Sequence, residues 1–311
     1  MNTLTTLGEV RQRVLDMGQE CYDDLVPVKD MKFESLESVR IGSQEHHLRV
    51  LAQRCLAYRF GVPFHYLEKC PPEVQAFNLN HWLEKERNEK LFIRFDGEEV
   101  RAVFTPRYVP VDNYDVLGKL GDLGYGDDVE VQSRLDEEFM LLNIPDRKTE
   151  FSVDLKGVDK MRSGLSIGNS EVGLRSLSIS AFILRLVCTN GLIGTRDVTV
   201  SYRHISSKVL ERFPEVLEGT VKELGVQRHQ LGLSLRSPVS DPQQTMKTFN
   251  LRFQLGKVEQ DAVEWAWPQE RGETMFNVVN AYTRAAQYPE LCAESSFRLQ
   301  RVGGMILGLV N

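Results

Sequence analysis

The chain has 311 residues, of which 41% are hydrophobic and 26% charged, a composition typical of a folded globular protein. It excludes collagen-like, mucin-like and disordered chains. At about 150 residues per domain, the length indicates two domains or one large one. No apolar run reaches the ~18 residues of a membrane span, and residues 1–8 lack the features of a secretory signal, so we expect a cytoplasmic protein. The five cysteines are scattered without a C-x-x-C pair, which predicts neither a disulfide framework nor a structural zinc site.

The net charge of −6 argues against a nucleic-acid partner only if the charge is spread evenly along the chain. Counted by block, it is −1 for residues 1–60, −8 for 61–150, +4 for 151–212 and −1 for 213–311. The block 151–212 is therefore the part of the chain that favours an anionic ligand.

The N-terminal part predicts helices. An apolar stripe with helical spacing runs from Leu48 to Leu56 and is ended by Gly61 and Pro63. A second predicted helix follows Pro71-Pro72 and ends in the charged run 84–90.

From Leu91 the pattern changes to the alternation typical of strands. Asp96-Gly97 suits the positive φ of a tight turn and predicts a β-hairpin of residues 91–95 and 100–104. Residues 174–186 fit both a strand and a helix, and we favour a strand beginning near Ser176. The other predicted elements are a helix over 113–123, a hairpin of 129–135 and 139–144, a strand over 151–155, a turn at Asn190-Gly191 and a strand over 198–202.

The C-terminal part again predicts helices, over residues 206–224, 242–266, 273–287 and 295–309. The run 237–242 contains two prolines among small polar residues and predicts a linker. We therefore expect an α+β fold in which a central antiparallel sheet of hairpins is flanked by N-terminal helices and a helical C-terminal region. The corresponding regions are 1–90 (N-terminal helical region), 91–236 (sheet-rich core with the basic block) and 237–311 (C-terminal helical region).

No motif of a hydrolase, phosphate-binding loop or metalloprotease is present. Glu45-His46-His47 sets a carboxylate beside two imidazoles, but adjacent residues of a helix point about 100° apart and cannot chelate one ion cleanly. We expect these residues in an exposed first turn of a helix, and we expect no metal and no cofactor.

The segment 167–173 and the cations after it form a candidate binding site. Its two glycines let backbone amides approach a ligand, Asn169 and Ser170 supply polar groups, and arginines bind phosphates in a bidentate manner. The alternative is a structural loop whose arginines pair with the acidic residues of 61–150. The predicted nucleic-acid contacts in this block are Asn169, Ser170, Arg175, Arg185, Arg196, Tyr202, Arg203 and Lys208.

Two further sets of polar residues are candidates for ligand contact. Arg101, Arg107 and Tyr108 lie where a predicted strand ends and a loop begins, a usual place for binding residues. On the predicted helix after Arg271, a polar stripe fits a solvated face better than a site; it consists of Asn277, Asn280, Arg284 and Gln287.

These residues carry a family resemblance. The runs 169–173, 177–179 and 185–191 resemble the signature of phage/plasmid-like proteins grouped as domain of unknown function 932, with further matches at 61–63, 107–110 and 276–283. The resemblance covers most of residues 45–305. It implies a mobile-element protein, and such elements carry single-strand annealing proteins of the RecT or Redβ kind beside an exonuclease. Those annealing proteins form rings or helices of subunits, each with a β-hairpin sheet and helices that line a basic groove, and the predicted order of elements here is compatible with that design.

Our leading hypothesis is therefore a non-enzymatic protein that binds and anneals single-stranded DNA in the recombination or replication of a phage or plasmid. Its partners would be single-stranded DNA, further copies of itself in a ring or filament and an exonuclease, with no membrane. One rival is an enzyme acting on a small molecule or nucleotide, with a pocket around 169–171, Arg107 beside it and Glu171 as acid or base. A second rival is an assembly protein of a mobile element, whose acidic segment 61–150 meets a basic partner.

Overall fold

The computed structural model describes residues 4–153, 159–186, 190–194 and 213–310, with residues 213–223 described by their backbone alone. The chain divides into two compact units, which we call the small unit (Gln12–Pro110) and the large unit (Met1–Arg11 with Val111–Asn311). The helix α1 (Leu7–Met17) contains the first boundary between them.

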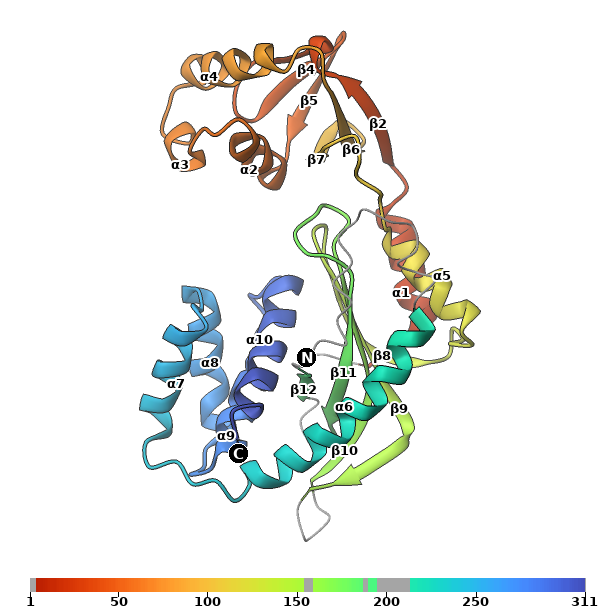
Figure 1. Cartoon of the computed structure of the whole chain (residues 1–311), viewed down its shortest axis with the longest axis vertical. Helices are drawn as coiled ribbons and strands as arrows, with labels where there is room; N and C mark the ends of the chain where they lie inside the picture. Colours follow the sequence, from red (N-terminus) through yellow and green to blue (C-terminus); the bar gives the residue numbers. More distant parts are fainter. Residues whose placement is uncertain (1–3, 154–158, 187–189, 195–212, 311) are drawn as a thin grey trace. The chain divides into compact units, whose positions relative to one another are not determined.

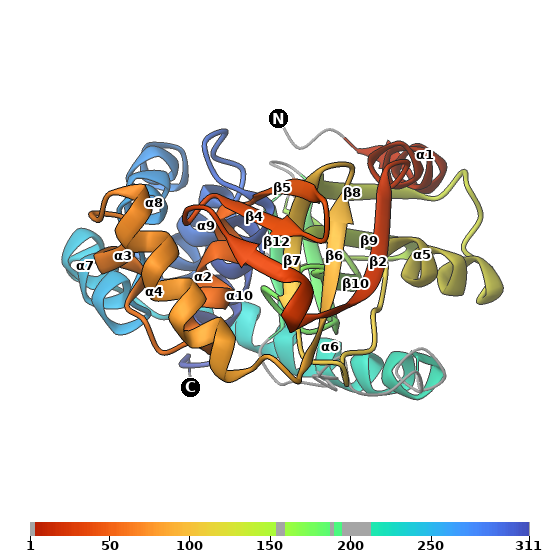
Figure 2. The same cartoon turned by 90° about the horizontal axis from the view of Figure 1, so that it is seen from above.

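The small unit is a sheet with helices packed on one side (Figures 1 and 2). Its strands lie in the order β2-β6-β7-β5-β4-β3, antiparallel except for the parallel pair β5 and β7. The strands are β2 (Cys21–Pro27), β3 (Met31–Phe33), β4 (Ser38–Ile41), β5 (Gln44–Leu48), β6 (Lys90–Asp96) and β7 (Glu99–Phe104). The helices are η1 (Val28–Asp30), α2 (Val50–Arg59), α3 (Phe64–Leu67) and α4 (Pro72–Lys85). Apolar side chains of these strands and helices form one core, which includes Phe33, Leu56, Leu79 and Ile93.

The large unit is built on an antiparallel sheet in the order β1-β8-β9-β10-β11-β12. The strands are β1 (Thr5–Thr6), β8 (Glu130–Leu135), β9 (Met140–Ser152), β10 (Lys160–Asn169), β11 (Ser178–Arg185) and β12 (Asn190–Ile193). The helices are α5 (Asn113–Asp122), α6 (Phe213–Ser234), α7 (Pro242–Arg252), α8 (Lys257–Glu270), α9 (Met275–Ala285) and α10 (Ala293–Leu307). Figures 1 and 2 show α7 to α10 grouped on one side of this sheet and α5 on the other, with α6 running along the sheet.

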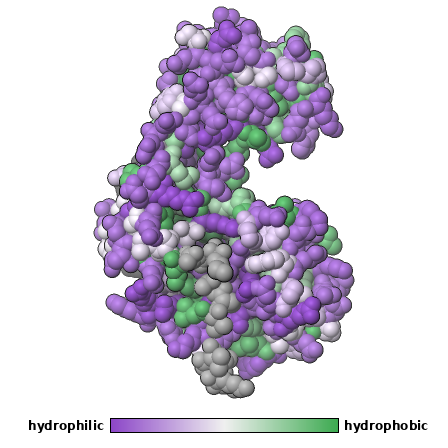
Figure 3. Space-filling view, turned by 180° about the vertical axis from the view of Figure 1, so that it is seen from behind, coloured by the Kyte–Doolittle hydropathy of each residue, from purple (hydrophilic) through white to green (hydrophobic). Residues whose placement is uncertain are grey.

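The side chains of the sheet alternate between two apolar clusters. Phe182 and Leu184 of β11 pack against Phe297 of α10. Ile183, on the opposite face of β11, belongs to the cluster that includes Leu231 of α6 and the buried side chains of α9. The sheet is thus covered by helices on both faces. On the side of the molecule that Figure 3 shows, hydrophilic residues cover most of the surface of each unit, and hydrophobic residues form only small patches between them.

The predicted α+β class is confirmed, and so are most elements between 50 and 186. Both predicted hairpins form, as β6 with β7 and as β8 with β9. Gly97 takes a φ of 54° in the first turn, as its position after Asp96 requires. The strand near Ser176 begins at Ser178, and the predicted strand 151–155 is, as far as residue 153 is described, the end of β9.

Several predicted elements are corrected by the structure. Residues 21–48 form the strands β2 to β5 in a region expected to be helical, and His46 is a buried residue of β5 rather than part of an exposed helical turn. Asn190 and Gly191 begin the strand β12 and do not form a turn. The predicted helix 242–266 is two helices, α7 and α8, separated at residues 253–256. The predicted strand 198–202 lies outside the described residues, and the three-region division stays a prediction.

Candidate functional site

The signature segment begins inside the sheet. Residues 167–169 belong to β10 and are buried, so the predicted loop that would offer amides to a ligand is absent there. Gly168 is required for packing, because a Cβ at this position would lie 2.8 Å from the Phe139 ring and 3.0 Å from Ser178 Oγ. The glycine therefore permits close contact between side chains and not with a ligand.

Asn169 and Glu171 fix the start of α5. The Asn169 amide is fully buried and donates to Val111 O at 3.0 Å and to Asn113 Oδ1 at 2.9 Å. Glu171 Oε1 accepts from the backbone N–H of Asn113 at 2.8 Å, one of the N–H groups that a helix start leaves without a partner. Both side chains thus hold the fold together, a role different from the predicted ligand contact or acid-base catalysis.

Ser170 ties together two connections of the large unit. Its hydroxyl donates to Glu138 O at 2.7 Å, in the turn between β8 and β9, and accepts from the N–H of Leu174 at 3.0 Å. The residue is fully buried. Ser170 therefore stabilises these two connections and is not exposed to a ligand.

The two described arginines of the predicted site form ion pairs within the protein. Arg175 pairs with Glu294 of α10, and Arg185 donates from Nε to Asp159 Oδ1 at 2.7 Å and from Nη1 to Glu270 Oε2 at 2.8 Å. These carboxylates belong to the large unit and lie outside the acidic segment 61–150. The alternative prediction, that the arginines form ion pairs within the protein, is therefore correct, but the predicted partners are wrong. Neither guanidinium is available as a free phosphate contact in this arrangement.

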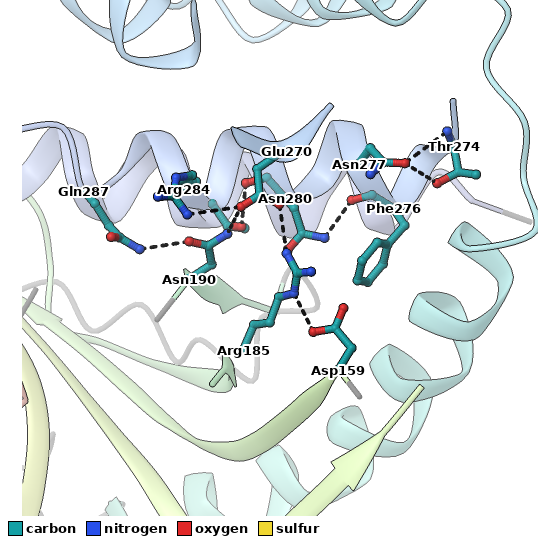
Figure 4. Close-up of polar contacts among 11 residues, drawn as sticks. Asp159, Arg185, Asn190, Glu270, Thr274, Phe276, Asn277, Asn280, Arg284 and Gln287 are labelled. Atoms are coloured by element: carbon teal, nitrogen blue, oxygen red, sulfur yellow. Dashed lines mark hydrogen bonds and ion pairs between the residues drawn. The ribbon is translucent and has the colours of Figure 1, made fainter. Parts of the chain in front are cut away.

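Glu270 is the centre of a polar network under α9 (Figure 4). Its carboxylate, 6% exposed, also accepts from Asn190 at 3.0 Å and pairs with Arg284 at 3.4 Å. Gln287 Nε2 donates to Asn190 Oδ1 at 2.9 Å. The polar stripe on the 273–287 helix is therefore not simply a solvated face, since Arg284 and Gln287 join α9 to α8 and β12.

Three further residues that the sequence predicts as nucleic-acid contacts lie in the small unit, and they differ in how exposed they are. Arg101 is 6% exposed within β7. The ring of Tyr108 stacks on Phe104, with centroids 3.7 Å apart and planes 2° apart, which occupies one face of the ring. Arg107 is exposed and fits a surface contact. Four further predicted contacts lie outside the described residues: Arg196, Tyr202, Arg203 and Lys208.

A cavity of about 680 Å³ lies elsewhere in the large unit. It is lined by residues that precede or begin β8, by the middle of β9 and β10 and by α6, which runs along these strands (Figure 1). Its apolar walls include Ile144, Pro145 and Leu165. A bulge between Arg162 and Gly164 shapes this part of the sheet, where β10 passes the proline of β9.

Arg228 of α6 lines this cavity in a fixed position. Its guanidinium lies 4.1 Å from the centroid of the Phe151 ring, and Nη2 donates to Ser163 Oγ at 2.6 Å. Nε is buried without a hydrogen-bond partner, and Arg228 forms no ion pair with any carboxylate that the structure describes. Arg228 thus differs from Arg185 and Arg284, which both pair with Glu270.

Further cations surround the bulge, and we call them the β9–β10 cations: Arg147, Lys148, Lys160 and Arg162. Glu130 pairs with Arg147 at 2.8 Å, and Glu150 pairs with Lys160 at 2.8 Å and with Arg162 at 3.4 Å. These cations lower the pKa of Glu150 below its usual range, chiefly through its hydrogen bond to Lys160. Lys148 is exposed and has no carboxylate partner among the described residues.

The cavity also contains a hydroxyl that stays protonated. Burial raises the pKa of Tyr125 above its usual range, and the charge of Asp146 adds to this effect. The phenol is therefore a hydrogen-bond donor at neutral pH. Asp128 and Asp146, which also line the cavity, are exposed carboxylates and accept hydrogen bonds.

The sequence carries little that marks this cavity. Arg228 lies between Gln227 and His229 in a helix, without any motif. The one usable signal is Pro145 in a strand pattern, because proline inside a strand indicates a bulge or an edge. The position of α6 beside that bulge depends on packing and not on local sequence.

Within the described ranges, no group of three histidine, cysteine or acidic side chains is placed to hold a metal ion. Cys21, Cys55, Cys70 and Cys292 are free thiols. In the same part of the chain, no helix is both long and apolar enough to cross a membrane.

Comparison with known proteins gives one match. Neither a curated protein nor a solved structure matches the chain. The family model described as "Domain of unknown function (DUF932)" matches residues 100–288, which is more than half of the chain. The signature runs 169–173 and 185–191 both lie within the matched residues. The chain therefore belongs to the DUF932 family.

Proposed function

We propose that this protein is a non-enzymatic single-stranded DNA-binding protein that promotes annealing in the recombination or replication of a phage or plasmid. We further propose that it works as a homo-oligomer, in a ring or filament. The observation that carries the proposal is the β9–β10 cations beside Arg228, on one part of the large unit. Binding to a single strand without sequence preference depends on cations that follow the phosphate backbone.

The contacts proposed for DNA differ from those expected from the sequence. Arg185 is 18% exposed and is held by two carboxylates, and the side chain of Arg175 is 39% exposed against 65% for Arg147, so we assign the phosphate contacts to Lys148, Arg147 and Arg228 instead. Arg147 keeps 65% of its side chain exposed although Glu130 pairs with it. An exposed ion pair of this kind contributes little to stability, so a phosphate can replace the carboxylate at low cost.

The test is fluorescence anisotropy of a labelled 20-nucleotide oligo-dT with the full chain, at 50 and 200 mM salt. Because each neutralised phosphate releases counterions, affinity should fall steeply with salt. The variant Lys148→Gln should weaken binding severalfold and reduce the slope of log K against log salt by about 1. Lys247→Gln is the matched control, because Lys247 is also exposed but lies on α7.

Two results would overturn the proposal. One is an affinity that does not change between the two salt concentrations, and the other is an equal effect of Lys148→Gln and Lys247→Gln. Electron microscopy with and without the oligonucleotide tests the assembly separately. Rings or filaments are expected, and a monomer indifferent to DNA would contradict this part.

A further inference from the structure

The Arg228 guanidinium lines the cavity beside α6 and forms no ion pair with a carboxylate among the residues that the structure describes. Ser163 and the Phe151 ring hold the Arg228 guanidinium on two sides. A cation without a counter-ion attracts an anion. An anionic oxygen in the cavity would pair with this guanidinium and accept hydrogen bonds from it.

The cavity has room for a ligand larger than a small inorganic anion. Its volume of about 680 Å³ lies within the usual range of ligand pockets and far exceeds one phosphate ion. Val129, Ile144, Pro145, Leu165 and Leu224 give it apolar walls. These walls fit a flat or apolar body attached to the anionic group.

The polar groups of the lining specify the rest of the ligand. The hydroxyl of Tyr125 can donate to a carbonyl or ring nitrogen. Asp128 and Asp146 can accept from amino or hydroxyl groups, and because both are exposed, solvent screens their repulsion of an anion. A ligand that combines an anion, a flat ring and such donors and acceptors is a nucleotide.

We propose that this cavity binds a nucleoside monophosphate unit, with its phosphate on Arg228 and Ser163 and its base against the wall of Ile144, Pro145 and Leu165. The unit can be a free nucleotide or one nucleotide of a single strand. The second source rests on the proposed DNA-binding function, whereas the first does not.

Isothermal titration calorimetry of the full chain tests the proposal, with dTMP, thymidine and inorganic phosphate as separate probes. We expect dTMP to bind at least tenfold more tightly than either thymidine or inorganic phosphate, because only dTMP engages both the guanidinium and the apolar wall. Equal weak binding of dTMP and inorganic phosphate would overturn the assignment of a nucleotide.

Two variants locate the site. Arg228→Gln should weaken dTMP binding at least tenfold, since charge-assisted hydrogen bonds to the phosphate are lost. Arg236→Gln removes the same charge just after α6 at an exposed position outside the cavity and should leave binding unchanged. Gly225→Met keeps the charge but fills space, because a Cβ on Gly225 meets no atom within 4 Å in a cavity that this residue lines. It should also weaken dTMP binding.

The same variants separate this inference from the proposed function. If oligo-dT binds the native chain and neither Arg228→Gln nor Gly225→Met changes its affinity or that of dTMP, the inference fails and DNA binding stands. If dTMP binds through Arg228 and oligo-dT does not bind at all, the inference stands for a free nucleotide and the proposed function fails. Loss of both ligands in Arg228→Gln, with Arg236→Gln unaffected, supports a nucleotide of the single strand.

Discussion

Arg185 was expected to contact phosphates, whereas its position in the structure predicts a role in stability. The change Arg185→Ala removes a guanidinium that is 18% exposed and that bridges Asp159 and Glu270. It also removes the cation that lies 5.2 Å from the centroid of the Phe276 ring. Glu270 then keeps Asn190 and the longer contact to Arg284 at 3.4 Å.

The cost follows from the burial of Glu270. Removing one partner of a buried ion pair destabilises a protein by about 3–5 kcal/mol, because the other charge stays buried. Since Arg185 has some contact with solvent and Glu270 keeps Arg284 as a partner, we expect the lower end, about 3 kcal/mol. Arg175→Ala is the comparison, because Arg175 is 39% exposed and its pair with Glu294 should contribute less than about 1 kcal/mol.

Urea unfolding followed by tryptophan fluorescence measures this difference. Trp82 lies in the small unit and Trp265 and Trp267 in the large one, so a Trp82→Phe background reports on the large unit alone. A loss below about 1 kcal/mol for Arg185→Ala, or equal losses for Arg185→Ala and Arg175→Ala, would refute the structural role of the network. DNA affinity per folded molecule should not change in either variant.

Three further outcomes are expected from the packing of the large unit. Gly164→Ala should destabilise the large unit by about 2 kcal/mol or more, because a Cβ would lie 2.0 Å from Ile144 O. Gly232→Ala in α6 places its Cβ in open space and should stabilise the helix by about 0.5–1 kcal/mol. Thermal unfolding compares the two variants. Tyr282→Phe should cost about 1–2 kcal/mol in urea unfolding, because the buried hydroxyl donates to Met246 O at 2.9 Å. Burial raises the pKa of Tyr282, so the folded state keeps this proton above pH ~10 while the unfolded state loses it, and stability should fall as pH rises above that value. The fall should be shallower in Tyr282→Phe, and equal slopes in both proteins between pH ~10 and ~11.5 would contradict the assignment.

The parts of the fold that the sequence predicts are those specified by local pattern. The hairpin of β6 and β7 follows from alternating residues around Asp96-Gly97, and the two strands need no distant partner to form. The helix α4 begins at the second residue of the pair Pro71-Pro72 and ends in a charged run, and both features are local signals.

The parts that were missed depend on distant residues. Gly191 follows Asn190, a strong local turn signal, yet a Cβ on Gly191 would lie 2.5 Å from the Phe182 ring. The glycine is there because β12 packs closely on β11, and this packing overrides the turn preference. In the small unit, β5 pairs in parallel with β7 about 50 residues further along the chain, so no hairpin pattern marks it.

The candidate site shows the same division. The sequence identifies polar and charged residues correctly, but their roles depend on partners far along the chain. Arg175 and Glu294 are 119 residues apart, and Arg185 and Glu270 are 85 apart. No spacing rule connects such pairs, so the sequence cannot separate a structural arginine from a binding one.

The difference between structural and binding residues also applies to the residues of the family signature. The signature residues Asn169, Ser170 and Arg185 lie within the matched region, and in the structure they join strands, helices and turns to one another. In this chain these three signature residues therefore make contacts within the fold. The chain has 38 basic and 44 acidic side chains, so ion pairs within the fold can occupy many of its cations. Lys148 and Arg228 form no ion pair with a described carboxylate and lie on β9 and in the lining of the cavity, and neither belongs to the signature. Binding is thus best sought beside the bulge of β9 and β10, at positions where the fold leaves positive charge exposed or facing a cavity.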